Sequence, residues 1–146
     1  MVEHIKCKIS NIEIRISKQY QIFKYQMTET NKKPYDLEKR TYEFAKNVRI
    51  FIKKLPRTVS NIEDSKQVIR SSGSIGANYI EANEALGKKD FNMRIKISRK
   101  EAKESIFWLK LIDVNNNEEL ERERVLLSRE ASELTNIFGA IVRKSA

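Results

Sequence analysis

Polar and apolar residues follow a helical spacing through most of the chain after Pro34. In the first such stretch, the positions on one helix face recur at intervals of four and three residues, as in helix bundles. They are Leu37, Thr41, Phe44, Val48, Phe51 and Leu55. Asp36 is a favourable N-cap before this set, and Pro56 cannot continue a helix. The pattern predicts a helix over residues 37–55.

The second predicted helix runs from Ser60 to about Leu86. Ser60 and Glu63 have the spacing of a capping box, in which each side chain accepts a hydrogen bond from the backbone N–H of the other residue. Gly87 follows the last apolar position and is a natural helix stop. A long helix between two short connections is therefore expected.

Two more helices are predicted in the second half of the chain. Asp90 is the expected N-cap of the third, which continues until the asparagines at 115–117 interrupt its pattern. The fourth begins at Glu118, where acidic residues suit the positive end of the helix dipole, and ends near Arg143. The positions predicted to face neighbouring helices are Phe91, Ile95, Ser98, Ala102, Ser105, Leu109 and Ile112 in the third helix and Leu120, Leu127, Ala131, Leu134, Phe138 and Ile141 in the fourth.

Short connections between successive helices favour antiparallel neighbours. We therefore predict an all-α fold, an antiparallel up-down-up-down four-helix bundle over residues 35–146, preceded by an N-terminal extension over residues 1–34. A chain of 146 residues suits one such domain with a substantial core.

The extension over residues 1–34 has a different pattern. Ile12, Ile14 and Ile16 alternate with polar residues, and a shorter alternation precedes them at 5–9. This period of two is typical of β-strands, but two short strands have little stability of their own. We expect the extension to pack on the bundle, to pair with another chain or to remain mobile. Met27 also begins a stretch that would suit a natural start, which would make the preceding residues an upstream extension.

The stretch over residues 70–91 is rich in serine, glycine and alanine, and the predicted bundle is organised around it. Gly73 and Gly76 each cost a helix interior roughly 1 kcal/mol relative to alanine, so we expect another backbone to approach closely there. The tetrapeptide at 73–76 also matches the G-x-x-G loop of KH domains, but that loop needs a surrounding sheet. We favour close helix packing.

A stripe of polar residues lies beside these glycines. Arg70, Ser74, Asn78 and Glu81 are four, four and three residues apart. Antiparallel pairing across the turn at 87–89 brings glutamates of the third helix close to this stripe. We predict a structural polar network that fixes the register of the two helices, formed by Arg70, Ser74, Asn78, Glu81, Glu101 and Glu104.

Few residues of this sequence suit catalysis or metal binding. His4 is the only histidine and Cys7 the only cysteine, and both precede the predicted bundle. The Glu-x-x-His motif of di-metal bundles is absent, and no serine has a histidine to activate it. We therefore expect no catalytic residues, no metal and no cofactor. One cysteine excludes an internal disulfide and no apolar run is long enough for a membrane span, so we expect a cytoplasmic protein without a membrane partner.

The net charge changes the functional expectation. The sequence has 29 Lys and Arg against 20 Asp and Glu, a formal charge of +9, which favours acidic partners such as nucleic acid. The candidate nucleic-acid-binding residues are Lys39, Arg40, Lys46, Arg49, Lys53, Lys88, Lys89, Arg94, Lys96, Arg99, Lys100 and Lys103. These charges fit either phosphate binding or an ordinary solvated surface.

Three segments of the chain resemble a known family. They are YDLEKRTYEFAKNVRIFIKKLP, QVIRSSGSIGANYIEANEA and DFNMRIKISRKEAKESIFWLKLI, within residues 35–141. The most specific parts are the pattern R-S-x-x-S-I-x-x-N-x-x-E at 70–81 and E-S-x-x-W-L at 104–109. The chain is similar to the four-helix bundle proteins encoded in intervening sequences of bacterial 23S rRNA genes.

The resemblance implies a homo-oligomer, a ring of five, with no known enzymatic activity. Together with the charge it favours rRNA or another nucleic acid as a partner. Accessory proteins of diversity-generating retroelements are similar bundles that bind nucleic acid and a reverse transcriptase, which makes a reverse transcriptase an alternative partner. We predict a non-enzymatic RNA- or DNA-binding protein, with a structural or assembly scaffold as the alternative. Apolar residues outside the predicted helix contacts suit self-association, and they are Tyr42, Ile50, Ile52, Phe107 and Ile137.

Overall fold

The computed structural model describes residues 1–3, 6, 21 and 36–146. The chain divides into two units between Lys33 and Pro34, and we describe the second in detail. The isoleucines whose alternation predicts strands lie outside the described residues, and Lys6, within the shorter alternation at 5–9, is helical. Among the residues that are described, no strand occurs.

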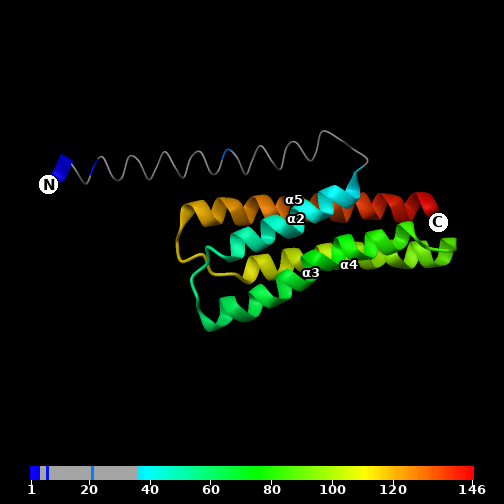
Figure 1. Cartoon of the computed structure of the whole chain (residues 1–146), viewed down its shortest axis with the longest axis horizontal. Helices are drawn as coiled ribbons and strands as arrows, with labels where there is room; N and C mark the ends of the chain where they lie inside the picture. The colour runs from blue at the N-terminus through cyan, green and yellow to red at the C-terminus, as the bar shows by residue number, and fades with distance from the viewer. Residues whose placement is uncertain (4–5, 7–20, 22–35) are drawn as a thin grey trace. The chain divides into compact units, whose positions relative to one another are not determined.

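The second unit contains four α-helices. They are α2 (Leu37–Ile52), α3 (Val59–Asn83), α4 (Lys88–Leu111) and α5 (Glu118–Ser145). Each helix packs against the next in the chain, and α5 also packs against α2, so that the bundle is closed (Figure 1). Helices α2 and α4 lie diagonally across the bundle, and their backbones do not approach each other closely. The predicted all-α four-helix fold is therefore confirmed.

Two of the four helices begin as predicted. Oδ1 of Asp36 accepts a hydrogen bond from the backbone N–H of Lys39 at 2.9 Å, which caps α2. Asn117 caps α5 in the same way, because its Oδ1 accepts the N–H of Leu120 at 3.1 Å. Both caps satisfy donors that a helix start leaves unpaired.

The predicted N-caps of the other two helices are wrong, although α3 begins at Val59, next to the predicted start near Ser60. Thr58 rather than Ser60 caps α3, with its Oγ1 accepting the N–H of Asn61 at 3.2 Å. Gly87 is the N-cap of α4 and has no side chain to offer, so Asp90 lies inside the first turn. Asp90 still has a favourable place there, because a carboxylate suits the positive end of the helix dipole.

Two predicted helix ends are also too late. Helix α2 ends at Ile52, and the turn that follows still brings Leu55 into the core. Helix α3 ends at Asn83, before Leu86, whose side chain is fully exposed. An exposed leucine adds no buried surface that would hold another helical turn in place.

The core contains the positions predicted from the helical spacing. All six positions predicted for the first helix are buried. In α4 and α5 the predicted positions are buried as well, except for the half-buried Phe91 and Ile141 at one end of the bundle. The alternation of four and three residues thus identifies the buried faces of three helices.

Small polar side chains make the contact between α3 and α4. The hydroxyls of Ser71 and Ser105 are 2.8 Å apart and both residues are fully buried. The hydroxyl of Ser98 donates to the carbonyl of Ile75 at 2.9 Å. Because each buried hydroxyl has a partner, these helices pack closely without an unpaired polar group at these positions.

The close approach predicted for the two glycines occurs at one of them. A Cβ at position 76 would lie 2.9 Å from Oγ1 and 3.3 Å from Cβ of Thr41, so α2 and α3 meet there. A Cβ at position 73 would meet only Nη2 of Arg49, at 3.4 Å. Gly76 therefore permits helix packing, whereas Gly73 lies under the end of one flexible side chain.

Candidate nucleic-acid interface

The candidate basic residues divide into two sets, because they come from helices that lie diagonally across the bundle. The set on and after α2 consists of Lys39, Arg40, Lys46, Arg49 and Lys53. The set on α4 consists of Lys88, Lys89, Arg94, Lys96, Arg99, Lys100 and Lys103. The two sets belong to opposite sides of the bundle, and one protomer cannot present them as a single surface.

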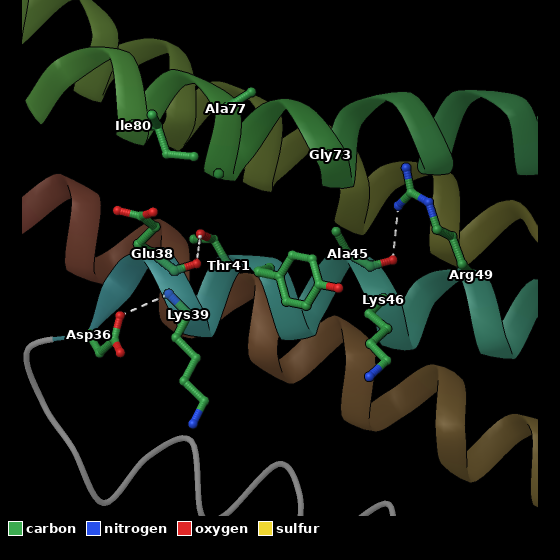
Figure 2. Close-up of a pocket in the computed structure, with 12 residues that line it drawn as sticks. Asp36, Glu38, Lys39, Thr41, Ala45, Lys46, Arg49, Gly73, Ala77 and Ile80 are labelled. Atoms are coloured by element: carbon green, nitrogen blue, oxygen red, sulfur yellow. Dashed lines mark hydrogen bonds between the residues drawn. The ribbon is translucent and has the colours of Figure 1, made fainter. Parts of the chain in front are cut away.

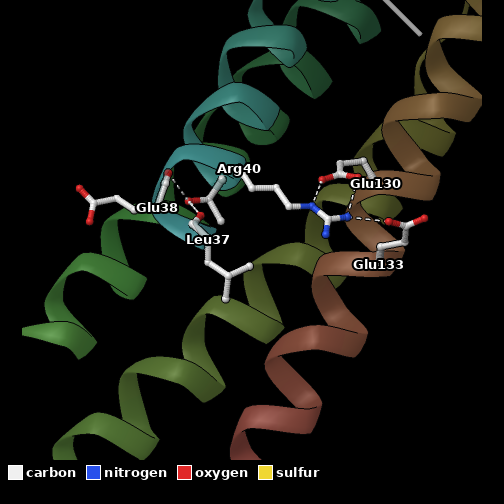
Figure 3. A network of polar contacts seen from close by, with 6 residues as sticks. Leu37, Glu38, Arg40, Glu130 and Glu133 are labelled. Carbon is white, nitrogen blue, oxygen red and sulfur yellow. Dashed lines mark hydrogen bonds and ion pairs between the residues drawn. The ribbon is translucent and has the colours of Figure 1, made fainter. Parts of the chain in front are cut away.

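Arg40 is part of an ion-pair network between α2 and α5 (Figure 3). Its Nε is 2.6 Å from Oε1 of Glu130, and its Nη2 is 3.0 Å from Oε2 of Glu130 and 2.6 Å from Oε2 of Glu133. Burial lowers the pKa of Arg40, but hydrogen bonds and charge from the two glutamates outweigh burial, and the pKa is raised. Because only 12% of its side chain is exposed, Arg40 holds two helices together and does not belong to a phosphate-binding surface.

Arg94 is also occupied by acidic neighbours. Its Nη1 lies 2.7 Å from Oε2 of Glu81 and 3.3 Å from Oδ1 of Asn78, and its Nε lies 3.9 Å from Asp90. These contacts connect α4 to α3. Arg94 therefore contributes to helix register and has little charge to offer a ligand.

The polar stripe on α3 is divided between two clusters. Asn78 and Glu81 contact Arg94, as described above, and Asn78 also donates from Nδ2 to the carbonyl of Ser74 at 2.9 Å. The side chain of Asn78 therefore contacts Arg94 of α4, where a glutamate of the third helix was expected. Arg70 approaches Glu104 at 3.8 Å, but 71% of the Arg70 side chain is exposed, so this pair is weak.

Glu101 and Glu104 have different surroundings on α4. Oε1 of Glu104 accepts a hydrogen bond from Nε1 of Trp108 at 3.2 Å. Oε2 of Glu101 is buried and has no hydrogen-bond partner among the described residues. Burial raises the pKa of the Glu101 carboxyl, the charge of Glu104 raises it further, and Lys100 and Arg70 oppose the shift.

The basic residues of α2 border a groove between α2 and α3 (Figure 2). The groove is lined by small residues of both helices, among them Ala45, Gly76 and Ala77. Figure 2 shows that Lys46 points away from α3, whereas Arg49 reaches toward it and donates from Nη1 to the carbonyl of Ala45 at 2.9 Å. The carboxylates of Asp36 and Glu38 lie at the same groove, so its charge is mixed. A polyanion is therefore less favoured there.

The outer face of α4 is rich in exposed lysines. We define the α4 lysine strip as Lys88, Lys89, Lys96, Lys100 and Lys103, all of which are exposed. None of them forms an ion pair with a described residue. The first four line a shallow depression with Asn92, Met93 and Ile97, and no carboxylate contributes to that lining.

An aromatic side chain continues this face of α4. Phe107 follows Lys103 by four residues and is 56% exposed. Its ring meets that of Trp108 edge to face, with centroids 5.0 Å apart and an interplanar angle of 78°. Trp108 is half-buried, so Phe107 is the ring that a stacking partner could reach.

The comparison with known families decides the relationship of the chain. A model of the 23S rRNA-intervening sequence protein family matches residues 33–138. The chain belongs to this family. The matched region extends from just before α2 to Phe138 in α5 and so includes all of α2, α3 and α4.

A solved structure supports the same relationship. The crystal structure of a protein of unknown function from the S23 ribosomal protein family of Bacteroides thetaiotaomicron is similar to this chain, with a TM-score of 0.59 and 29% sequence identity. The similarity covers 72% of this chain and 96% of that one. A search of curated proteins found no match.

In this chain, the R-S-x-x-S-I pattern lies along α3. Ser71 and Ile75 of the pattern are fully buried, and both contribute a polar atom to the contact with α4. The remaining positions flank that contact. The most specific part of the motif is therefore built into helix packing.

The sequence patterns did not predict the structural roles of Glu123, Glu130 and Gly139. Glu123 and Glu130 lie in the buried face of α5, where Glu123 accepts from Nζ of Lys54 at 2.8 Å. The available signal was their position, between the buried leucines of that helix. Gly139 carries the same local signal as Gly76, because a glycine inside a helix is unfavourable unless its small size is needed.

Other kinds of site find little support in the part of the chain that is described. His4 and Cys7 lie outside it. Within it, His, Cys, Asp and Glu side chains do not gather in groups of three that could hold a metal ion. Its helices also include none long and apolar enough to cross a membrane.

Proposed function

We propose that this protein is a non-enzymatic, homo-oligomeric RNA-binding protein whose RNA-contacting surface is the outer face of α4. One observation carries the proposal, the α4 lysine strip, whose five ammonium groups are exposed and have no described carboxylate as a partner. Arg40, Lys54 and Arg94 are bound by acidic side chains, and the exposed Lys39 and Lys46 of α2 lie at a groove that also contains Asp36 and Glu38. Free ammonium groups are the ones that can exchange counterions for phosphates.

The chemistry of this face favours contact with the RNA backbone over reading of bases. Lysine ammonium groups bind phosphates as point charges and do not distinguish one base from another. Phe107 adds a ring at the end of the strip on which an unpaired base could stack. Binding should therefore have little sequence preference and should prefer RNA with single-stranded segments.

Self-association would strengthen such binding. Tyr42 on α2 is 64% exposed and offers an aromatic surface to a second copy of the chain. An oligomer would present several α4 faces to one RNA molecule and raise the effective concentration of each. A ring of five, as the family resemblance implies, would be one such assembly. Light scattering should give a mass well above the 17.1 kDa of one chain, and a monomer at micromolar concentration would contradict self-association.

A charge-reversal pair tests the proposed surface. Lys96→Glu combined with Lys100→Glu reverses two charges of the strip, and fluorescence anisotropy with a partly single-stranded RNA measures the result. Affinity is expected to fall about tenfold or more at low salt, because each phosphate contact contributes to binding. The matched control is Lys39→Glu combined with Lys46→Glu on α2, which changes the net charge equally.

The control separates a defined surface from overall charge. Affinity reduced equally by both double variants would mean that RNA follows net charge and that α4 is not the surface. Undetectable binding of the unmodified protein at low salt would overturn RNA binding itself. In that case the exposed aromatic residues would favour the alternative, a scaffold that binds a protein such as a reverse transcriptase.

A further inference from the structure

A glycine in the C-terminal part of α5 leaves room for two arginines. Gly139 is buried, and glycine is among the least favourable residues in a helix interior. A Cβ at this position would lie 3.3 Å from Nη1 of Arg143 and 3.4 Å from Nε of Arg99. Two guanidinium groups, one from α4 and one from α5, therefore lie against the same part of the helix backbone.

Neither arginine has a counter-charge among the described residues. Arg99 and Arg143 form no ion pair there, whereas Arg40, Arg94 and Arg124 each contact a carboxylate. Nε of Arg99 is also buried without a hydrogen-bond acceptor. A buried donor without an acceptor and two neighbouring positive charges are both unfavourable. An anion beside the two guanidinium groups would relieve the repulsion between their charges.

The surroundings of the pair favour a phosphate group as that anion. Lys96 and Lys103 precede and follow Arg99 by three and four residues, on the same face of α4, and both are exposed. Guanidinium groups present paired N–H donors in a plane that matches two oxygens of a phosphate. A phosphodiester has two free oxygens, so it could face one arginine with each.

We infer that Arg99 and Arg143 form a phosphate-binding site on the α4/α5 face, occupied by an internal phosphodiester of a bound RNA strand. Lys96 and Lys103 contact the neighbouring phosphates. This inference rests on the proposed RNA binding and makes it more specific, because lysines supply charge without the fixed geometry of a guanidinium pair. Gly139 has a defined part in the site, since a methyl group there would touch Nε of Arg99 and would require Nη1 of Arg143 to shift by a few tenths of an ångström.

Gly139→Ala tests the site without removing a charge. Alanine favours a helix more than glycine does, and the atoms it would meet are the ends of flexible side chains, so the fold is retained. RNA affinity at low salt is expected to fall up to about fivefold, less than for the loss of a whole charge-assisted contact, because Nη1 of Arg143 shifts only slightly. The control is Gly73→Ala in α3, where the added methyl group would also lie beside an arginine, Arg49 of α2. This variant is expected to leave RNA affinity unchanged.

Two lysine variants test the geometry of the pair. Arg99→Lys and Arg143→Lys keep both positive charges but remove the forked donors. Each is expected to lower RNA affinity by a similar factor without changing its dependence on salt, because the number of cations is the same. Unchanged affinity in Gly139→Ala and in both lysine variants would overturn this inference and leave the proposed RNA binding standing.

Titration with inorganic phosphate can show the opposite case, in which the phosphate site exists but RNA binding does not. The Nε–H resonance of Arg99, followed by NMR, is expected to shift when RNA is added and to shift less in Gly139→Ala. A shift with phosphate from a protein that does not bind RNA would show a site for free phosphate and overturn the RNA part of both proposals. The absence of a shift with either ligand would overturn the site.

Discussion

Thr41 on α2 occupies the space that a side chain at Gly76 on α3 would need. Its Oγ1 would be 2.9 Å from a Cβ at position 76, and that hydroxyl is held in place because it donates to the carbonyl of Leu37 at 2.7 Å. The two helices are therefore as close at this point as a glycine allows.

The two glycines of α3 should respond to alanine with opposite signs. Gly76→Ala is expected to destabilise the fold by about 1 kcal/mol, because overpacking costs about 1–3 kcal/mol and the gain in helix propensity returns roughly 1 kcal/mol. Gly73→Ala should gain up to about 1 kcal/mol, since only the end of Arg49 lies nearby. Urea unfolding of both variants measures the difference. Equal effects would contradict the close contact with Thr41.

The Arg40 network predicts an unequal effect of two neighbouring glutamates. Glu130→Gln leaves the buried side of the guanidinium without a carboxylate, and loss of one partner of a buried pair costs about 3–5 kcal/mol. We expect the lower end of that range, because Arg40 keeps Glu133. Glu133→Gln should cost less than about 1 kcal/mol, since this carboxylate is half-exposed. Denaturant unfolding compares the two, and similar losses would show that burial of Glu130 is unimportant.

The raised pKa of Glu101 leads to a prediction that its effect on stability depends on pH. Its pKa is raised above the ordinary value of 4.5 by burial and then by Glu104, so the folded protein binds this proton more tightly than the unfolded chain. Ionisation at neutral pH therefore costs stability. Glu101→Gln is expected to increase the free energy of unfolding at neutral pH, and the gain should fade as the pH falls toward 4.5, where both states become protonated.

An exposed glutamate supplies the control for this pH dependence. Glu84 is exposed and forms no ion pair with a described residue, so Glu84→Gln should change stability little at any pH. Urea titrations of both variants over a series of pH values make the comparison. A gain for Glu101→Gln that persists unchanged at acidic pH would show that ionisation is not its cause.

The buried faces of the helices could be predicted because helical spacing reflects burial directly. Phe44, Ile95 and Leu134 all lie where the alternation of four and three residues places them. The start of α3 could not be predicted in this way, since Thr58 and Ser60 are both good caps. The choice depends on Asn61, whose side chain bonds to the backbone of Pro56 and Asp113 and so ties the start of α3 to the end of α4.

The candidate interface was harder to predict from the sequence, because a lysine or arginine can form an ion pair with a carboxylate that is far away in the sequence. Arg40 looks like its exposed neighbours on a helix pattern, yet its partner Glu130 is 90 residues later. Arg99 of α4 and Arg143 of α5 meet beside Gly139, and the sequence around each arginine does not predict this contact. Only Gly139 carried a local signal, a glycine among good helix formers.

The salt dependence of RNA binding tests the central proposal most directly. The measurement is the affinity for a short single-stranded RNA as salt is raised, compared with the variant that combines Lys96→Ala and Lys100→Ala. If the α4 lysine strip and the arginine pair contact phosphates, log affinity should fall against log salt with a slope of about −4 to −5, roughly 0.7 for each contact. The double variant should have a slope shallower by about 1 to 1.5. A slope near zero, or one that the two substitutions leave unchanged, would contradict RNA binding through α4.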